Sequence, residues 1–331
     1  MRKIKKITAG EEGNVLVFTI FSMICMIGFA ALSIDMGTIM SARNQLQSAA
    51  DAAALSGAAG LMTNNNESKI KAIATASHNT CLNQPVIIGV SDVTFPQANQ
   101  VMIQAHQAVS LNFTSLLGIN TANISTIAVA ELNTIIGTTE LRPWAIPDMN
   151  YKPGDKVSIK VGVLEDPDGG SDLFYPVDFP PINRGGSVAS CGPCEYKRNI
   201  INGTSHYISV NDILQVNPEN LIMMTKRGVN ALIYKDPGAY WDPGYGVNGG
   251  VVHSSAGPDG SSSSPRVVIV PLYNRDEVPS SDWNTLTVTR LGAFFVTAFH
   301  GGKLKGVFMQ SWHQGTSGGG NSMVKSVKLV Q

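Results

Sequence analysis

The residues best suited to chemistry are Cys191 and Cys194, which enclose a Gly-Pro pair in a Cys-Gly-Pro-Cys motif. A Cys-x-x-Cys pair at a helix N-terminus can exchange disulfides, because the helix dipole lowers the pKa of the first thiol. The segment before the motif, residues 183–187, reads as a loop rather than as a strand that would deliver the pair to a helix. We therefore predict a local structural disulfide between Cys191 and Cys194, and leave open a redox centre, half of a zinc site, or pairing with Cys81.

An acidic segment at residues 165–172 is the stretch that best suggests a metal site. Its carboxylates, above all those of Asp166, Asp168 and Asp172, are spaced so that they could wrap a calcium ion. The segment lacks the twelve-residue frame and the terminal Glu of an EF-hand loop. A solvated acidic turn is the favoured interpretation and calcium the alternative, and no other cofactor is predicted.

Strings typical of enzymes are missing from the sequence or misplaced in it. Residues 244–249 match Gly-x-Gly-x-x-Gly, but they lie in a loop rich in Pro, Gly and Tyr, without the following helix that dinucleotide binding needs. No His-Glu-x-x-His or phosphate-loop string occurs, and the six His are far apart in the chain. We predict that the protein is not an enzyme.

Three aromatic residues, Tyr240, Trp241 and Tyr245, stand close together in that same loop region. They form either an exposed loop that contacts a partner or a glycan, or a cover over the core of their own domain. The cover is the favoured interpretation, and the three residues are kept as a candidate partner-contact loop.

The element that positions the whole chain is an uncharged run of twenty-one residues from Asn14 to Ile34. At about 1.5 Å rise per residue, a helix of this length matches the ~30 Å hydrocarbon core of a bilayer. Four cations precede the run at Arg2, Lys3, Lys5 and Lys6, and cationic flanks stay in the cytoplasm. We predict a retained transmembrane helix over 14–34 with residues 1–13 inside and the remainder outside; the alternative is a cleaved signal peptide, whose apolar region is usually shorter.

Beyond the run, the helical pattern turns amphipathic. Apolar residues recur at steps of three and four, at Ile39, Ala42, Leu46, Ala49 and Ala53. Polar residues such as Arg43, Asn44 and Asp51 fall on the other side. Such a face packs either against partner helices during assembly or against the protein's own domain, and the pattern does not choose between the two.

The N-terminal segment resembles a known family. Residues 13–60 contain GNVLVF, then GFAALSIDMG with Asp35 after the apolar run, then RNQLQSAADAAALSGAAG. This segment is similar to the start of the TadG-like proteins of the tight-adherence (Flp, type IVc) pilus system. The resemblance implies a component of pilus assembly in the cytoplasmic membrane, with other pilus or platform subunits as partners of the N-terminal helix.

A looser similarity to the C-terminal domain of some family members runs from Pro143 to Phe308. The chain departs from related proteins at one point. It lacks the acid at the fifth mature position of processed prepilins, where Phe18 or Val15 would stand. This departure argues against prepilin processing.

Composition restricts the partners. The 24 basic and 24 acidic residues give no net charge, which argues against a nucleic-acid partner and leaves lipid and protein. Charged residues make up 15% of the chain, against about 25% in average soluble domains, so that polar uncharged side chains supply much of the surface. Such a surface suits an exported protein that assembles with others.

The rest of the chain divides into segments of different pattern. Residues 35–140 are expected to form the extended helix and a small pilin-like region of helix and antiparallel sheet, with strands at 86–88, 100–109 and 123–132. Residues 141–313 are expected to form a larger β-rich domain, and residues 314–331 a flexible tail. In the larger domain the pattern predicts strands at 156–163, 173–179, 267–272, 285–298 and 303–310, with a helix at 225–235 capped by Thr225.

The fold class is therefore α+β, an N-terminal transmembrane helix followed by two extracytoplasmic regions. The function that best fits is a minor pilin-like or assembly-platform component of a tight-adherence pilus, located in the cytoplasmic membrane or on the pilus. The alternatives are a cell-surface binding protein that uses the Tyr/Trp loop, and a tethered thiol-disulfide oxidoreductase that uses Cys191 and Cys194.

Overall fold

The computed structural model describes residues 12–163, 173–186, 192–244, 250–254, 264–277, 279 and 284–330. The chain forms two compact units, which are described separately. The first unit contains Met1–Gly57, Lys69–Ala130 and Leu329–Gln331, and the second contains Ala58–Ser68 and Glu131–Lys328. The fold class is α+β, as the sequence predicted.

The first unit is built on one long helix, α1 (Glu12–Gly60). The predicted span 14–34 is its first part, and from Val15 to Ile34 nearly every side chain is exposed although most are apolar. In the part of the chain that the structure describes, α1 is the one helix long and apolar enough to cross a membrane. The same helix continues without a break into the amphipathic part.

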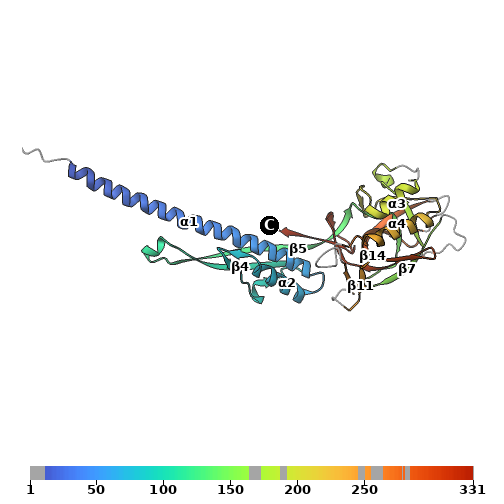
Figure 1. The fold of residues 1–331 in the computed structure, drawn as a ribbon, viewed down its shortest axis with the longest axis horizontal. Coiled ribbons are helices and arrows are strands. Elements are labelled where there is room, and N and C mark those ends of the chain that lie inside the picture. The colour runs from blue at the N-terminus through green and yellow to red at the C-terminus, as the bar shows by residue number, and fades with distance from the viewer. Residues whose placement is uncertain are drawn as a thin grey trace, which may run out of the picture. The chain divides into compact units, whose positions relative to one another are not determined.

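A hairpin lies along the second part of α1 (Figure 1). Strand β4 (Gln100–Ser110) and strand β5 (Thr121–Thr138) are neighbours in one sheet, and β4 also pairs antiparallel with the short β3 (Val93–Thr94). The alternation predicted for β4 is correct, because Val101, Ile103 and Ala105 are fully buried. The other elements of this part of the chain are α2 (Asn65–Ser77), β1 (Thr80–Cys81), β2 (Gln84–Pro85) and η1 (Val90–Asp92).

The core of the first unit consists mainly of small residues. The other elements contribute mainly buried Ala, Val and Ile. The buried apolar residues that α1 contributes are Ala42, Leu46, Ala49, Ala50, Ala53 and Ala54. Small side chains let a helix approach its neighbours closely, which suits a hairpin packed along α1. The strand predicted at 86–88 is wrong. Val86 and Ile88 are buried and Ile87 is exposed, which is the alternation of a strand, but the segment is irregular because it does not pair with another strand among the described residues.

The second unit is built around a sheet that closes on itself. Its strand order is β10-β14-β13-β6-β8-β7-β15, and β15 also pairs with β14, which closes the circuit. Most pairs are antiparallel, but β13–β6 and β7–β8 are parallel. The strands are β6 (Trp144–Asp148), β7 (Lys156–Val161), β8 (Leu173–Asp178), β10 (Ile213–Val216), β13 (Val267–Asn274), β14 (Thr285–His300) and β15 (Lys303–Met309).

Large aromatic side chains fill the interior of the second unit. Trp144 meets Phe174 edge-on with ring centroids 6.3 Å apart, and Phe294 meets Phe308 at 5.1 Å. All four are fully buried. Edge-to-face contacts of this kind add stability beyond the area that the rings bury.

The second unit contains α3 (Pro193–Asn202) and α4 (Ile222–Lys235). The sequence predicted α4 but placed its start wrongly at Thr225. Leu221 is the N-cap, and Thr225 lies inside the helix, fully buried, where its hydroxyl donates to the Leu221 carbonyl at 2.9 Å and contacts the Tyr196 hydroxyl at 3.0 Å. Helix α3 was not predicted, because the Cys-Gly-Pro-Cys motif was read as part of a loop.

The C-terminal segment is not the flexible tail that its glycines suggested. Strand β17 (Thr316–Gly318) pairs with residues 134–137 of β5, and β18 (Val324–Val330) pairs with β16 (Ser311–Trp312). The Lys325 ammonium donates to the Thr134 hydroxyl at 2.8 Å. The remaining short strands are β9 (Ile208–Ser209), β11 (Tyr240–Asp242) and β12 (Val251–His253).

Candidate functional site

The helix face that the sequence proposed for assembly is packed inside the first unit. Ala42, Leu46, Ala49 and Ala53 are at most 1% exposed, and Ile39 is half-buried. Their burial corresponds to the packing alternative that the sequence left open. A role of these five residues in assembly stays a prediction.

Contacts beside this face come from the turn at β1 and from β5. The buried Cys81 thiol donates to the Ala42 carbonyl at 3.3 Å, and the Gln45 side chain accepts from the Leu82 amide at 2.7 Å. Burial raises the pKa of the Cys81 thiol, so it stays protonated and inert at neutral pH. The Gln47 amide donates to the Ile127 carbonyl at 3.2 Å.

Asp35 is the first acid after the apolar run, and its side chain is only 2% exposed. Its carboxylate accepts hydrogen bonds from three successive backbone amides: Asn112 at 3.0 Å, Phe113 at 3.1 Å and Thr114 at 2.6 Å. These amides precede and begin the 3-10 turn η2 (Thr114–Leu117), where backbone N–H groups otherwise lack partners. We call Asp35 with these three amides the Asp35 site.

The hydrogen bonds determine the ionisation of Asp35. Burial alone would raise the pKa of this carboxyl, but the N–H groups of Thr114, Asn112 and Phe113 favour its charged form and lower the pKa below its usual value. The sequence showed Asp35 only as one residue of the family resemblance. The signal that could have revealed the site is an acid directly after an apolar run. A charge at such a place is costly to bury, so its carboxylate is expected to have hydrogen-bond partners.

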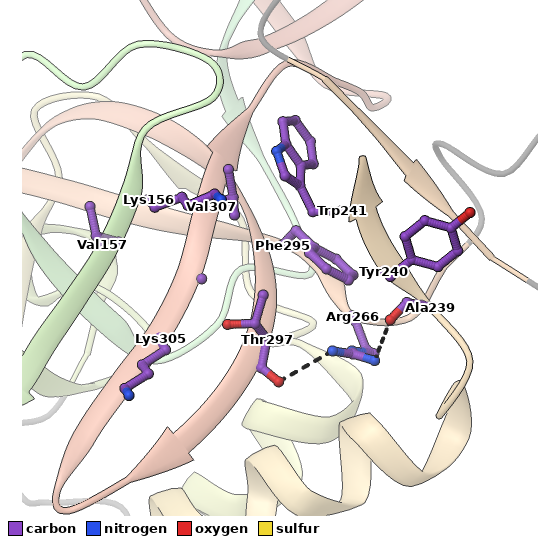
Figure 2. Close-up of a pocket in the computed structure, with 11 residues that line it drawn as sticks. Lys156, Val157, Ala239, Tyr240, Trp241, Arg266, Phe295, Thr297, Lys305 and Val307 are labelled. Carbon is purple, nitrogen blue, oxygen red and sulfur yellow. Dashed lines mark hydrogen bonds between the residues drawn. The ribbon is translucent and has the colours of Figure 1, made fainter. Parts of the chain in front are cut away.

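A second candidate site is an open cleft of about 460 Å³ beneath the β11–β12 hairpin in the second unit. Figure 2 shows Trp241 and Phe295 on one side of it and Lys156, Val307 and Lys305 on the other. The Trp241 indole nitrogen is buried and has no hydrogen-bond partner among the described residues. Gly306 lies in the same wall and must be glycine, because a Cβ there would lie 2.3 Å from the Phe294 ring.

Arg266 fixes the hairpin above the cleft. Its buried guanidinium donates to the carbonyls of Val296, Asp236, Ala239 and Thr297 at 2.9 to 3.3 Å and lies 4.8 Å from the Phe295 ring centroid. Burial lowers the pKa of Arg266, opposed by the nearby Asp236. Arg266 therefore has a structural role: it connects the chain after α4 to β14 and so positions Trp241.

Lysines of β7 and β15 line one border of the cleft and lie further along the same sheet. The register pairs Val307 with Lys156, Lys305 with Ser158, and Lys303 with Lys160. Since paired residues and every second residue along a strand share a face, the side chains of Lys156, Lys160, Lys303 and Lys305 lie on one face of β7 and β15. The cleft thus combines an aromatic wall with a cationic border, an arrangement suited to binding a ligand.

The predicted aromatic loop is only partly described. Tyr240 is 56% exposed and stacks on His253 with ring centroids 4.9 Å apart, whereas Trp241 is half-buried against the core. Tyr245 lies outside the described residues. Tyr240 therefore presents aromatic surface, and Trp241 serves both the core and the cleft.

The predicted disulfide is not tested, because Cys191 lies outside the described residues. Cys194 is exposed in the first turn of α3, behind Pro193 at the helix start. The motif thus meets a helix N-terminus, which the sequence analysis did not expect. The calcium candidates Asp166, Asp168 and Asp172 also lie outside the described residues, and among the described ones no group of three or more His, Cys, Asp or Glu is placed to hold a metal ion.

Among the residues that the structure describes, one helix is long and apolar enough to cross a membrane, and a hairpin packs along its second part. Residues 13–60 match the family model described as putative Flp pilus-assembly TadE/G-like. The match coincides with α1, and over this segment the chain is similar to the TadE/G-like pilus-assembly proteins. No curated protein and no solved structure matches the chain.

Proposed function

We propose that the protein is a minor pilin-like or assembly-platform subunit of a tight-adherence pilus, anchored in the cytoplasmic membrane and without catalytic activity. The observation that carries this proposal is the coincidence of the family match at 13–60 with α1, whose first part is exposed and apolar. An exposed apolar helix of this length is stable in a bilayer and not in water.

The proposed orientation has the N-terminus in the cytoplasm and both compact units outside. Arg2, Lys3, Lys5 and Lys6 support it, because Lys and Arg beside a span are retained on the cytoplasmic side. Protease added to intact cells, or to spheroplasts where an outer membrane is present, should then digest the region after Asp35. Protection of that region in intact spheroplasts would contradict the orientation.

The helix face available to partner subunits differs from the face that the sequence suggested. Because Ala49 and Ala53 are enclosed in the first unit, Ala49→Asp or Ala53→Asp would abolish piliation simply by disrupting that unit. Met36 and Met40 lie one turn apart and remain 48% and 61% exposed. We therefore assign the assembly contact to the exposed side of α1 that carries these two methionines.

The test compares Met40→Lys with Ser41→Lys, which adds the same charge at a neighbouring exposed polar position. Met40→Lys should reduce sheared pili and adherence at least tenfold with unchanged protein level in the membrane, and Ser41→Lys should leave both near the level of the unchanged protein. Equal piliation in the two variants would reject the assembly face. Normal piliation after complete deletion of the gene would reject the pilus function itself.

A second candidate function is binding of an acidic glycan in the cleft at Trp241. The Trp241 ring in the cleft wall and the lysines at its border favour it, since sugar rings stack on aromatic side chains and sugar carboxylates pair with ammonium groups. The full-length protein in detergent should bind oligogalacturonate more tightly than the neutral galactose oligomer. Trp241→Ala and Lys305→Glu should each weaken binding at least fivefold, whereas Lys226→Glu, an exposed position on α4 outside the cleft, should not. Equal affinity for the two oligomers would reject this function.

A further inference from the structure

The connection between β4 and β5, residues 111–120, is the part of the first unit nearest the apolar run of α1. We call it the hairpin tip. Its sequence, LNFTSLLGIN, contains no charged residue. Phe113 is 38% exposed and Ile119 is 55% exposed, so the tip presents apolar side chains to its surroundings.

The Asp35 site fixes the level of the hairpin tip along α1. Asp35 follows the last residue of the apolar run directly, and it holds the amides of Asn112, Phe113 and Thr114. At about 1.5 Å rise per residue, Gln47 lies some 18 Å further along the helix axis. Gln47 in turn contacts the Ile127 carbonyl, so the hairpin extends away from the apolar run and its tip is the end nearest to it (Figure 1).

We propose that the hairpin tip is seated in the membrane surface beside α1, with Phe113 and Ile119 in contact with lipid. The proposal rests on membrane insertion of the apolar run and does not depend on the pilus role. A lipid surface is the occupant that the position favours, because the end of the apolar run is where a bilayer's hydrocarbon region ends. The polar groups of the tip, those of Asn112, Ser115 and Asn120, suit the headgroup layer.

The Asp35 site explains how a charged carboxylate can lie beside the hairpin tip at the membrane surface. A carboxylate at the edge of the hydrocarbon region is costly unless its oxygens have partners. Three amide donors meet that need and withdraw Asp35 from solvent. The protein then has two membrane contacts, the span and the tip, which together prevent α1 from rotating about its axis and keep the Met36–Met40 side in one direction.

The experiment uses the full-length protein in vesicles of palmitoyl-oleoyl phosphatidylcholine and phosphatidylglycerol. An environment-sensitive fluorescent amino acid is encoded at Ile119 in one sample and at Ile127 in a second. The two positions are matched, because both are isoleucines that are 55% exposed in the same unit. A third sample carries the probe at Ile24 within the apolar run.

Lipid-attached nitroxide should quench the probe at position 119 at least threefold more than the probe at 127, and aqueous iodide should show the reverse order. Equal iodide quenching at 119 and 127 would overturn the proposal, since the tip would then be in water. Shielding of 119 from both quenchers would also overturn it, in favour of a protein partner or a second copy. The probe at 24 reports the anchor separately: if nitroxide fails to quench it, the membrane anchoring of the proposed function fails as well.

Discussion

The two compact units achieve a core by opposite means. In the first unit the contact surface of α1 consists almost entirely of alanines, whereas the second unit buries Trp144, Phe174, Phe294 and Phe308 inside a closed sheet. An aromatic side chain buries several times the apolar area of an alanine, and each square ångström contributes about 25 cal/mol. Each of these buried aromatic side chains therefore contributes more to the stability of its unit than a buried alanine does.

The difference extends to the buried polar groups. In the second unit they connect elements far apart in sequence: Asp148 with Arg290, Asp212 with Arg184, and Asp236 with Ser254 and Ser264. In the first unit the most elaborate buried polar contact is the Asp35 site, at the end nearest the apolar run. We infer that the second unit is organised as an ordinary globular domain, and that the first is organised around the position of α1.

Breaking the Arg290–Asp148 pair should produce the largest effect and confine it to the second unit. The guanidinium meets both carboxylate oxygens, and the two side chains are 10% and 16% exposed. Arg290→Ala should lower the free energy of unfolding by about 3–5 kcal/mol, because it leaves a largely buried charge without its partner. Denaturant unfolding followed by near-UV circular dichroism measures it.

The control for that variant is Arg198→Ala. Arg198 and Glu195 are an exposed pair 3.5 Å apart, and such pairs contribute between about 0 and 1 kcal/mol. A loss of equal size in the two variants would show that burial does not distinguish them.

Enlarging an alanine should affect the first unit and spare the second. Ala49 is 1% exposed on the packed face of α1, so Ala49→Leu forces the helix away from its neighbours and should cost about 1–3 kcal/mol. Hydrogen exchange should rise in 69–130 and remain unchanged in 131–328. Met40→Leu, an apolar change on the exposed side, is the control, and comparable exchange in both variants would contradict the small-residue packing.

The Cys191–Cys194 pair tests whether the second unit also carries chemistry. A disulfide that closes so short a loop restricts the unfolded chain little, and Cys194→Ser should cost about 1–3 kcal/mol without loss of any turnover. The full-length protein should reduce insulin no faster than a free dithiol. Robust turnover that disappears in Cys191→Ser would establish the oxidoreductase alternative.

Periodicity predicted several of the longer elements, although it missed α3 and placed a strand wrongly at 86–88. The uncharged run, the stripe from Ala42 to Ala53, and the alternation in β4 and β7 all correspond to elements of the structure. These patterns report burial directly, because each buried residue recurs with the period of its own element. The strands predicted at 285–298 and 303–310 are β14 and β15, and the turn between them contains Gly301 and Gly302, which both take positive φ.

Features that depend on contacts between distant segments were not predictable. The glycine-rich end of the chain was expected to be flexible, but β17 is held by β5 from almost two hundred residues earlier. The lysine face arises only when Lys303 and Lys305 are placed in register with β7. Thr225 resembled an N-cap, yet its hydroxyl serves a buried contact with Tyr196 inside the helix.

The smallest effect that we predict is a local response of the Asp35 site to acid. The folded pKa of Asp35 lies below the usual value of 3.8, so its hydrogen bonds stabilise the fold fully above about pH 4 and are lost as pH falls through the folded pKa. Amide chemical shifts of Asn112, Phe113 and Thr114 should therefore stay constant from neutral pH to about pH 4 and move together only below it. The same shifts in Asp35→Asn should not titrate, because the amide side chain has no proton to gain. A midpoint above the usual Asp value would mean that burial outweighs the three donors, and the Asp35 site would then hold the hairpin less firmly than its geometry indicates.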